Sequence, residues 1–404
     1  MQDQALADVR VLDLTHYISG PYCTKLLADY GADVLKVERP KSGDGSRRMG
    51  PFPKDEPDPE KSGLFLHLNT NKKSFTLDLK SADAKDIVLR LVETVDIVVE
   101  SFRPGTMESL GIGYEALKSA KPDIVLTSVS NFGQTGPYRD YMLTDAMAYG
   151  MGGEMYSTGI ADREPVKLGE NVVLYQAGAV ASVATMGALF ASRLQAIGQH
   201  VDVSIMETQV GSIDRRMSML LAYQYNGEIT RRTSASVGFG YPTGVFLCAN
   251  GYIQINGGGN YFQRVVNMMD NPPELDDPTW YEPESQFNSD LADIFKAYFI
   301  PWCLERTKSE IWQAAQEAGV LTGTLNTIEE LIEDQHFIQR EAFADVEHPK
   351  AGRLMQPGRP FIMSESPWSI RSPAPLLGQH TDEILTSLGY HADEVARLHK
   401  EGVV

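Results

Sequence analysis

The first 130 residues alternate between short, β-rich apolar runs and segments of helical character. The apolar runs predict strands at 9–15, 33–38, 74–79, 96–101 and 123–130. Helices are predicted between them, at about 21–30, 82–95 and 106–120. Two strands joined through a helix run parallel, because the helix carries the chain back to the edge from which it started. The alternation therefore predicts an α/β fold with a doubly wound, Rossmann-like sheet.

The rest of the chain predicts a long helix and then a second, smaller domain. The helix is expected at about 176–195 and consists mostly of small, uncharged residues. A polar, Gly-rich stretch at 226–244 indicates a segment that crosses between domains. Short strands and helices follow, and from about residue 324 the chain is punctuated by Pro and Gly until a helix at 380–389.

Charge and cysteine content argue against several classes of protein. Lysine and arginine number 36 against 54 aspartates and glutamates, a net charge of −18, which disfavours general binding of nucleic acid or anionic membranes. Three cysteines far apart fit neither a disulfide framework nor a metal site, and favour a reducing compartment. The start lacks signal-peptide features, and the apolar run at 177–192 is short and Gly/Ala/Ser-rich, which favours a packed helix over a membrane span. We therefore expect a cytoplasmic protein without nucleic-acid or membrane partners.

Several common motifs are missing. The sequence contains no phosphate-binding G-x-x-x-x-G-K-[ST] loop, no metal-binding spacing of its histidines and no G-x-S-x-G nucleophile elbow. The first strand is followed by THYISGP rather than by G-x-G-x-x-G, so the dinucleotide fingerprint is missing as well. The Gly-rich loop at 256–260, NGGGN, is interpreted first as a tight turn, with ligand contact as the alternative.

Six short motifs at loop positions carry a resemblance to a known family. They are GPYCTKLLADYGADVLKVERP, GDGSR, NTNKKSFTLDLK, VESFRPGTMESLGIGYEAL, SNFGQTGPYRD and APLLGQHTDEILTSLGY. From about residue 8 to residue 394 the chain resembles the class III CoA-transferases, the CaiB/BaiF family, which includes α-methylacyl-CoA racemases and carnitine CoA-transferases. The resemblance implies a large Rossmann-like domain, a smaller domain and a C-terminal segment that returns to the large one, in an interlocked dimer. The expected boundaries are 1–225 for the large domain, 226–244 for the linker, 245–325 for the small domain and 326–404 for the returning segment.

The resemblance also implies which residues bind CoA. These are Arg39, Arg47, Leu77, Lys80, Ser101, Phe102 and Arg103. A guanidinium that follows a strand of an open α/β sheet is well placed for phosphate, although Arg39 is equally well interpreted as a surface residue paired with a neighbouring carboxylate. Ile18, Ser109 and Ser130 stand where family members carry polar or basic residues, which argues against tight CoA binding by this chain.

The nucleophile of the family is missing from its usual position. Class III transferases use an aspartate four residues before a glycine in the first turn of a long helix, and here that glycine is Gly178 and the fourth residue before it is Leu174. The reaction passes through an anhydride, so only a carboxylate can serve. Glu170 is a weak candidate for a displaced carboxylate, because four extended residues span about 13 Å. A racemase is disfavoured too, since Thr144 stands at the position of the racemase histidine.

We therefore predict the non-catalytic subunit of a heteromeric transferase, paired with an Asp-bearing paralogue as in benzylsuccinate-type members. The complex would move CoA between succinyl-CoA and a carboxylic acid such as an aryl-dicarboxylate, with CoA and acyl-CoA as substrates and no permanent cofactor or metal. Gly178, Ala181 and Gly187 permit close packing of the long helix, expected against the partner subunit. Two alternatives remain open: an active homodimer with a displaced carboxylate such as Glu170, and a CoA-thioester-binding protein.

Overall fold

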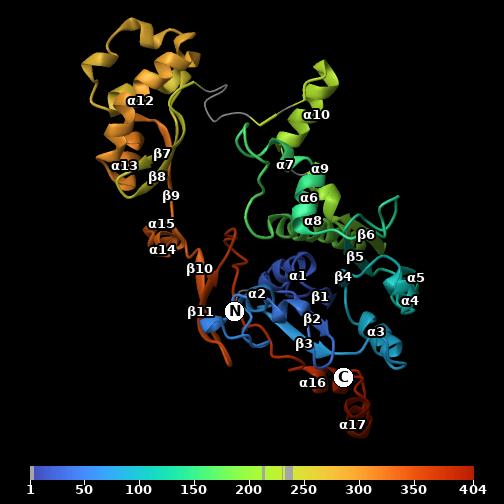
Figure 1. Ribbon diagram of the computed structural model, residues 1–404. Coiled ribbons are helices and arrows are strands. Elements are labelled where there is room, and N and C mark those ends of the chain that lie inside the picture. Colours follow the sequence, from blue (N-terminus) through green and yellow to red (C-terminus); the bar gives the residue numbers. More distant parts are fainter. Residues whose placement is uncertain (1–3, 212–213, 230, 233–239) are drawn as a thin grey trace. The chain divides into compact units, whose positions relative to one another are not determined.

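The computed structural model describes residues 4–211, 214–229, 231–232 and 240–404, which form two units (Figure 1). The large unit comprises Met1–Tyr156, Val166–Thr230 and Ile338–Val404, and the small unit comprises Ser157–Pro165 and Arg231–Phe337. Within the predicted crossing segment 226–244, residues 230 and 233–239 lie outside the described residues.

The large unit is built on a six-stranded sheet in which every neighbouring pair of strands is parallel. Its strands are β1 (Arg10–Leu14), β2 (Asp33–Glu38), β3 (Lys72–Thr76), β4 (Ile97–Glu100), β5 (Val125–Ser130) and β6 (Gln199–Ser204). Their order is β3-β2-β1-β4-β5-β6, so the direction of winding reverses between β1 and β4. The predicted doubly wound α/β fold is confirmed; β6 was not predicted, and β3 lies about two residues earlier in the chain than expected.

Helices cover both faces of this sheet (Figure 1). In chain order the helices that precede β7 are α1 (Ser19–Asp29), α2 (Gly63–Leu68), α3 (Ala84–Val92), α4 (Thr106–Ser109), α5 (Tyr114–Ala120), α6 (Asp145–Met151), α7 (Glu154–Ser157), α8 (Val172–Gln195), α9 (Ile205–Gly211) and α10 (Asp214–Asn226). One core packs α3 and α5 on the sheet through residues such as Ile87 and Leu117, and the other packs α1 and α8 on the opposite face. The single helix predicted at 106–120 is two helices, because Gly111 has a positive φ of 73° between them.

Helix α8 is a core element of the large unit. Among the described residues it is the one helix whose length and composition would allow it to cross a membrane. In the structure it packs on α1 and on strands β5 and β6, and a Cβ built on Gly178 would come within 2.5 Å of the carbonyl oxygen of Ser19. The expectation that Gly178 and Ala181 pack against a partner subunit is therefore wrong: both are buried within this chain, whereas Gly187 is exposed.

The small unit has a three-stranded antiparallel sheet, β7 (Thr243–Cys248), β8 (Gly251–Asn256) and β9 (Leu321–Leu325), in the order β7-β8-β9. Helices α11 (Phe262–Met268), α12 (Ser289–Leu304) and α13 (Lys308–Ala318) pack against it around an aromatic core. The three helices correspond to those that the sequence predicts near 260–270, 287–298 and 307–318, and β9 was not predicted. Two short helices, α14 (Ile328–Glu333) and α15 (Gln335–Gln339), follow.

The C-terminal segment returns to the large unit, as the family resemblance implied. It forms a hairpin, β10 (Phe343–His348) and β11 (Gly352–Pro357), and two helices, α16 (Thr381–Ser387) and α17 (Ala392–Glu401). The guanidinium of Arg371 donates hydrogen bonds to the carbonyl oxygens of Ala28, Gly31 and Ala32 at the end of α1. Val403 and Val404 complete the core on the α3 face of the sheet.

Candidate functional site

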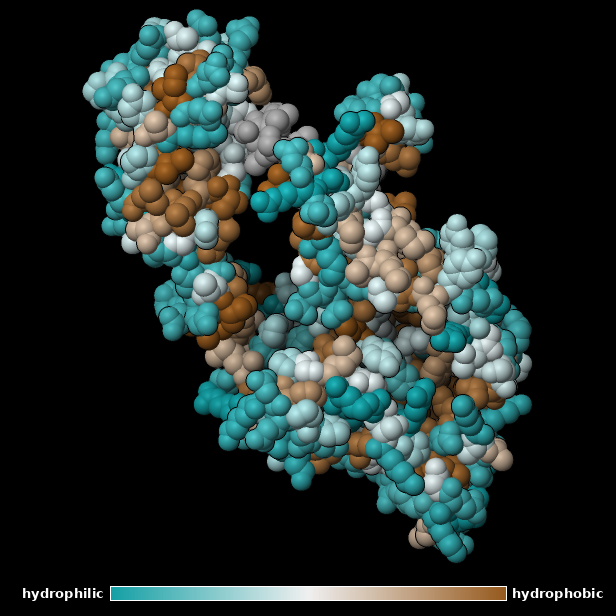
Figure 2. Space-filling model, viewed as in Figure 1, coloured by the Kyte–Doolittle hydropathy of each residue, from teal (hydrophilic) through white to brown (hydrophobic). Residues whose placement is uncertain are grey.

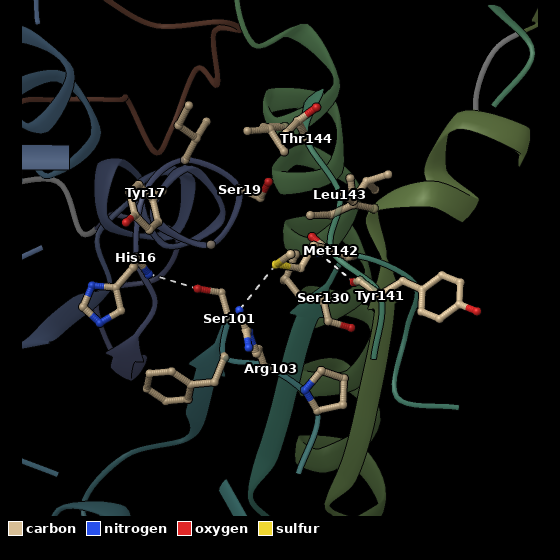
Figure 3. A pocket seen from close by; sticks show the side chains of 18 of the residues that line it. His16, Tyr17, Ser19, Ser101, Arg103, Ser130, Tyr141, Met142, Leu143 and Thr144 are labelled. Carbon is tan, nitrogen blue, oxygen red and sulfur yellow. Dashed lines mark hydrogen bonds between the residues drawn. The ribbon is translucent and has the colours of Figure 1, made fainter. Parts of the chain in front are cut away.

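A pocket of about 450 Å³ opens where the winding of the large sheet reverses (Figure 3). Its walls come from the segments that follow β1 (His16–Gly20), β4 (Ser101–Pro104) and β5 (Asn131), together with 139–145, Leu174 of α8 and Ile205. Open α/β sheets bind ligands at this place, because the loops after two neighbouring strands diverge there and leave a crevice. We call it the switch-point pocket.

A buried ion pair holds the loop that follows β1 in place. Lys36 Nζ lies 2.8 Å from Asp44 Oδ2, with both side chains fully buried. Asp44 Oδ1 accepts the backbone N–H of Tyr17, a residue with a positive φ of 68° whose ring packs over Gly45. The loop then enters α1 at Ser19, and a Cβ on the next residue, Gly20, would come within 2.3 Å of the side chain of Thr15. These contacts explain why THYISGP forms a tight turn without the glycines of a dinucleotide loop.

The loop after β4 is held by a buried carboxyl group. Glu100 Oε2 accepts the backbone N–H of Phe102 at 2.6 Å, and the Oγ of Ser101 accepts the N–H of His16 at 3.0 Å, which joins the two loops. Burial raises the pKa of Glu100 to about 7, against opposing hydrogen bonds from Ser128 and Phe102. The shape of this wall therefore depends on a group that titrates near neutral pH.

The start of α8 forms the apolar part of the pocket. Leu174, which stands at the position predicted for the family's nucleophile, lines it. Asp145 lies beside it, 8% exposed, and its Oδ1 accepts the backbone N–H groups of Val173 and Leu174 at 3.0 and 3.3 Å. Its Oδ2 lies 3.1 Å from Lys167 Nζ. Asp145 therefore caps α8 and is held by three donors.

The charged groups at the pocket are two arginines and two aspartates. Arg103 Nη2 lies 3.6 Å from the sulfur of Met142, and Arg139 lies 3.7 Å from Asp140 in a partly exposed pair. Burial, with help from Lys36, lowers the pKa of His16, so its imidazole is neutral at pH 7. Among the described residues that line the pocket, the cations at that pH are therefore the two guanidinium groups, and one of the two carboxylates is already held within the protein.

Three of the residues assigned to CoA binding, Ser101, Phe102 and Arg103, line the switch-point pocket together. Arg39 and Lys80 are exposed, after β2 and β3 respectively, and are not among the lining residues. Leu77 is 1% exposed and belongs to the hydrophobic core.

Arg47 lies away from this pocket in a buried ionic network along β1, β2 and β3. We use that name for Asp13, Lys36, Glu38, Asp44, Arg47 and Lys72, all at most 2% exposed. The guanidinium of Arg47 donates to both carboxylate oxygens of Glu38, to Glu60, and to two backbone carbonyl oxygens, so all its N–H groups are engaged. It also stacks 3.6 Å above the ring of Phe65. This environment supports a structural role, and we leave Arg47 out of the ligand contacts proposed below.

Glu170, the weak candidate for a displaced nucleophile, is exposed and is not among the residues that line the pocket. Its carbonyl oxygen, rather than its carboxylate, accepts a hydrogen bond from Lys167. Among the described residues no group of three or more His, Cys, Asp or Glu side chains is arranged to hold a metal ion.

Sequence reasoning did not single out Ser19, Arg139 or Asp145. Ser19 is the first residue of α1, and a serine two residues before Pro21 at a strand-to-helix turn was the available signal. Asp145 follows Thr144, whose Oγ1 caps α6. Its second role, capping α8 from 28 residues away, is a long-range contact that no local pattern encodes.

Comparison with known proteins gives the same assignment along almost the whole chain. The family model described as CoA-transferase family III matches residues 6–381. Over 407 residues the chain is 34% identical to succinyl-CoA–D-citramalate CoA-transferase of Chloroflexus aurantiacus, covering 99% of this chain and 98% of the relative. It is 31% identical over 422 residues to formyl-CoA:oxalate CoA-transferase of Bradyrhizobium diazoefficiens, covering 99% and 97% of the two chains.

A solved structure also matches this chain over almost its whole length. A CaiB/BaiF family protein from Brucella suis superposes with a TM-score of 0.84 at 26% identity, covering 96% of this chain and all of the other. Fold and pocket thus define a two-unit α/β protein of the CaiB/BaiF class. The chain belongs to CoA-transferase family III, and the predicted family is confirmed.

Proposed function

We propose that this chain is the non-catalytic subunit of a heteromeric class III CoA-transferase, paired with a paralogue that carries the nucleophilic aspartate. The observation that carries the proposal is Leu174 at the wall of the switch-point pocket. A leucine side chain cannot form the anhydride on which the family's chemistry depends. The scaffold around it is complete, with the β1 and β4 loops joined through Ser101 and α8 capped by Asp145.

The other carboxylates at the pocket offer little as replacements. Asp140 is largely exposed beside Arg139. Asp145 is held by two backbone N–H groups and by Lys167, so its attack on a thioester would release the cap of α8. The alternative function is an active homomeric enzyme with a displaced carboxylate. Asp145 is a better candidate for that carboxylate than Glu170, because Asp145 lines the pocket and Glu170 does not.

Two exposed apolar surfaces support a partner subunit. On α8, the side chains of Val183, Phe190 and Leu194 lie on one stripe and are 67–73% exposed. On the small unit, the open face of the β7–β9 sheet carries Val245, Leu247, Tyr252, Leu321 and Leu325, each at least 41% exposed. Figure 2 shows apolar side chains gathered over this part of the small unit. Patches of this kind mark interaction surfaces, and an interlocked arrangement of two related subunits would cover both.

The name of the Chloroflexus relative, a succinyl-CoA–D-citramalate CoA-transferase, supports succinyl-CoA as the donor. The acceptor is a carboxylic acid, and the benzylsuccinate-type acceptor remains a prediction.

The test is to express the chain alone and with an Asp-bearing paralogue, and to assay CoA transfer from succinyl-CoA. We expect activity only in the co-expressed pair. Hydroxylamine trapping during turnover, followed by mass spectrometry, should label an aspartate of the paralogue. Activity of the chain alone, or a label on its Asp145 or Glu170, would overturn the proposal.

Leu174→Asp in the isolated chain is expected to remain without transferase activity. The new carboxylate would lie beside Asp145, and the polar residues found in relatives at Ile18, Ser109 and Ser130 are still missing. The measurement is CoA exchange with succinyl-CoA, with Leu174→Asn as the uncharged control. Substantial transfer by the Asp variant would show that the chain lacks only its nucleophile.

A further inference from the structure

The amino end of α1 opens onto the switch-point pocket with an unpartnered hydroxyl. Ser19, the first residue of this 11-residue helix, lines the pocket. It is 7% exposed, and its Oγ has no hydrogen-bond partner among the described residues. Figure 3 shows Ser19 between the Tyr17 side and the Leu143 side of the pocket. A buried hydroxyl without a partner destabilises a fold by about 1–3 kcal/mol, so its presence requires an explanation.

The same position favours a negative charge. The first backbone N–H groups of a helix have no partner within the helix, and the helix dipole places partial positive charge there. Arg103 and Arg139 line the same pocket, and the Nε of Arg139 is buried without a partner among the described residues. Asp145, the buried carboxylate at the pocket, is already held by Val173, Leu174 and Lys167.

Leu174 changes what this pocket can accept. An aspartate at this position would place a second negative charge beside a bound carboxylate and weaken its binding. Leucine removes that repulsion and contributes an apolar wall. The volume of about 450 Å³ lies within the range of small-ligand pockets. Hydroxyls of Ser101, Ser130 and Thr144 line it together with apolar side chains, so a short acid with an oxygen-bearing or apolar body would fit.

We propose that the switch-point pocket of this chain holds a small free carboxylic acid non-covalently, anchored by the Oγ of Ser19 and the amino end of α1. Ser19 is then a residue that determines specificity for the free acid over its CoA thioester. The inference rests on the proposed function in one respect: it assigns a ligand to the pocket that no longer carries the nucleophile.

The test is a titration of the purified full chain, without partner and without thioester, with sodium succinate, by isothermal calorimetry. Succinamide serves as the uncharged isostere and CoA as the competing class of ligand. We expect succinate to bind, and succinamide and CoA to bind at least about tenfold more weakly. Equal binding of succinate and succinamide would overturn the inference, and so would tighter binding of CoA. The absence of succinate binding at concentrations up to 50-fold above the Kd of a weak site, roughly 1 mM, would overturn it as well.

Two pairs of variants, each a test and its control, locate the site. Ser19→Ala should weaken succinate binding about tenfold or more, since hydrogen bonds to charged groups contribute strongly, whereas Ser109→Ala, an exposed hydroxyl that donates to Thr106, should leave it unchanged. Leu174→Asp should weaken binding by like-charge repulsion and Leu174→Asn should not. Thermal unfolding of each variant confirms that it is folded. Wild-type affinity in Ser19→Ala would refute the anchor.

Failure of this inference is separable from failure of the proposed function. If the isolated chain binds no acid but supports transfer with the paralogue, only the inference falls. If it binds succinate but the isolated chain also transfers CoA, the subunit proposal falls.

Discussion

Two polar regions lie on either side of β1, and they differ in how far their polar groups are satisfied. On the β2–β3 side, the buried ionic network pairs its charges within the protein. Lys72, for example, contacts Asp13, Thr24, Asn69 and a backbone carbonyl oxygen. On the β4–β5 side, the switch-point pocket leaves Ser19 Oγ and Arg139 Nε without partners among the described residues.

The difference separates structural charges from ligand-binding groups. Buried charges are tolerated when they are paired and hydrogen-bonded, and the network shows this in its acidity. Burial alone would raise the pKa of Asp13, but Lys36 and Lys72 outweigh it and lower the pKa to about 2. The pocket groups that lack such partners are the ones available to a ligand. An arginine in a family motif is therefore assigned a role by its partners in the structure rather than by its motif.

The largest change in the free energy of unfolding is expected when Arg47 is removed from the buried ionic network. Arg47→Ala leaves Glu38 buried without its partner, and breaking a buried pair in this way destabilises proteins by about 3–5 kcal/mol. The measurement is urea unfolding of the full chain. Arg48→Ala removes the exposed neighbour, whose bond is to the carbonyl of Ser42, and should change the unfolding free energy by less than about 0.5 kcal/mol. Equal effects in the two variants would contradict a structural role for Arg47.

The second-largest effect on stability is expected from Glu100. Its pKa is raised in the folded protein, whereas the pKa of Asp13 is lowered. The pKa of Glu100 is raised from 4.5 to about 7, so ionisation disfavours the folded state. The free energy of unfolding should therefore fall by about 3 kcal/mol as pH rises from about 4.5 to about 7. In Glu100→Gln this fall should disappear, which urea unfolding across that pH range measures. A wild-type pH dependence in the glutamine variant would show that other groups are responsible.

The smallest effect is expected from Ser19. Because its hydroxyl is unpartnered within the described structure, Ser19→Ala should leave the unfolding free energy unchanged or raise it by up to about 1 kcal/mol. Differential scanning calorimetry without added acid measures this, and Thr24→Ala is the control. Thr24 Oγ1 donates to Asp13 at 2.6 Å and accepts from Lys72, so its loss should destabilise the protein. Clear destabilisation by Ser19→Ala would mean that the hydroxyl has a structural partner.

The sequence predicted what is local and periodic. The five strands β1 to β5 and the long helix α8 follow from apolar runs and turn residues. The absence of the nucleophile, inferred from the position of Leu174 relative to Gly178, stays a prediction. What was missed depends on distant contacts. Strand β6 is a half-exposed run with weak alternation, Asp145 acts across 28 residues, and the partners of Arg47 include Glu60 and the carbonyl oxygen of Pro375. No local pattern distinguishes such an arginine from one that meets a phosphate.

The returning C-terminal segment has a consequence for how the chain is made. Val403 and Val404 belong to the same core as Leu12 and Phe75. The guanidinium of Arg371 donates a hydrogen bond to the carbonyl oxygen of Ala28 at the end of α1. During synthesis on the ribosome, the small unit is therefore complete while the large unit still lacks part of its core. Exposed apolar strands in such an intermediate are prone to aggregation. The large unit can therefore complete this core only after Val403 and Val404 have been synthesised.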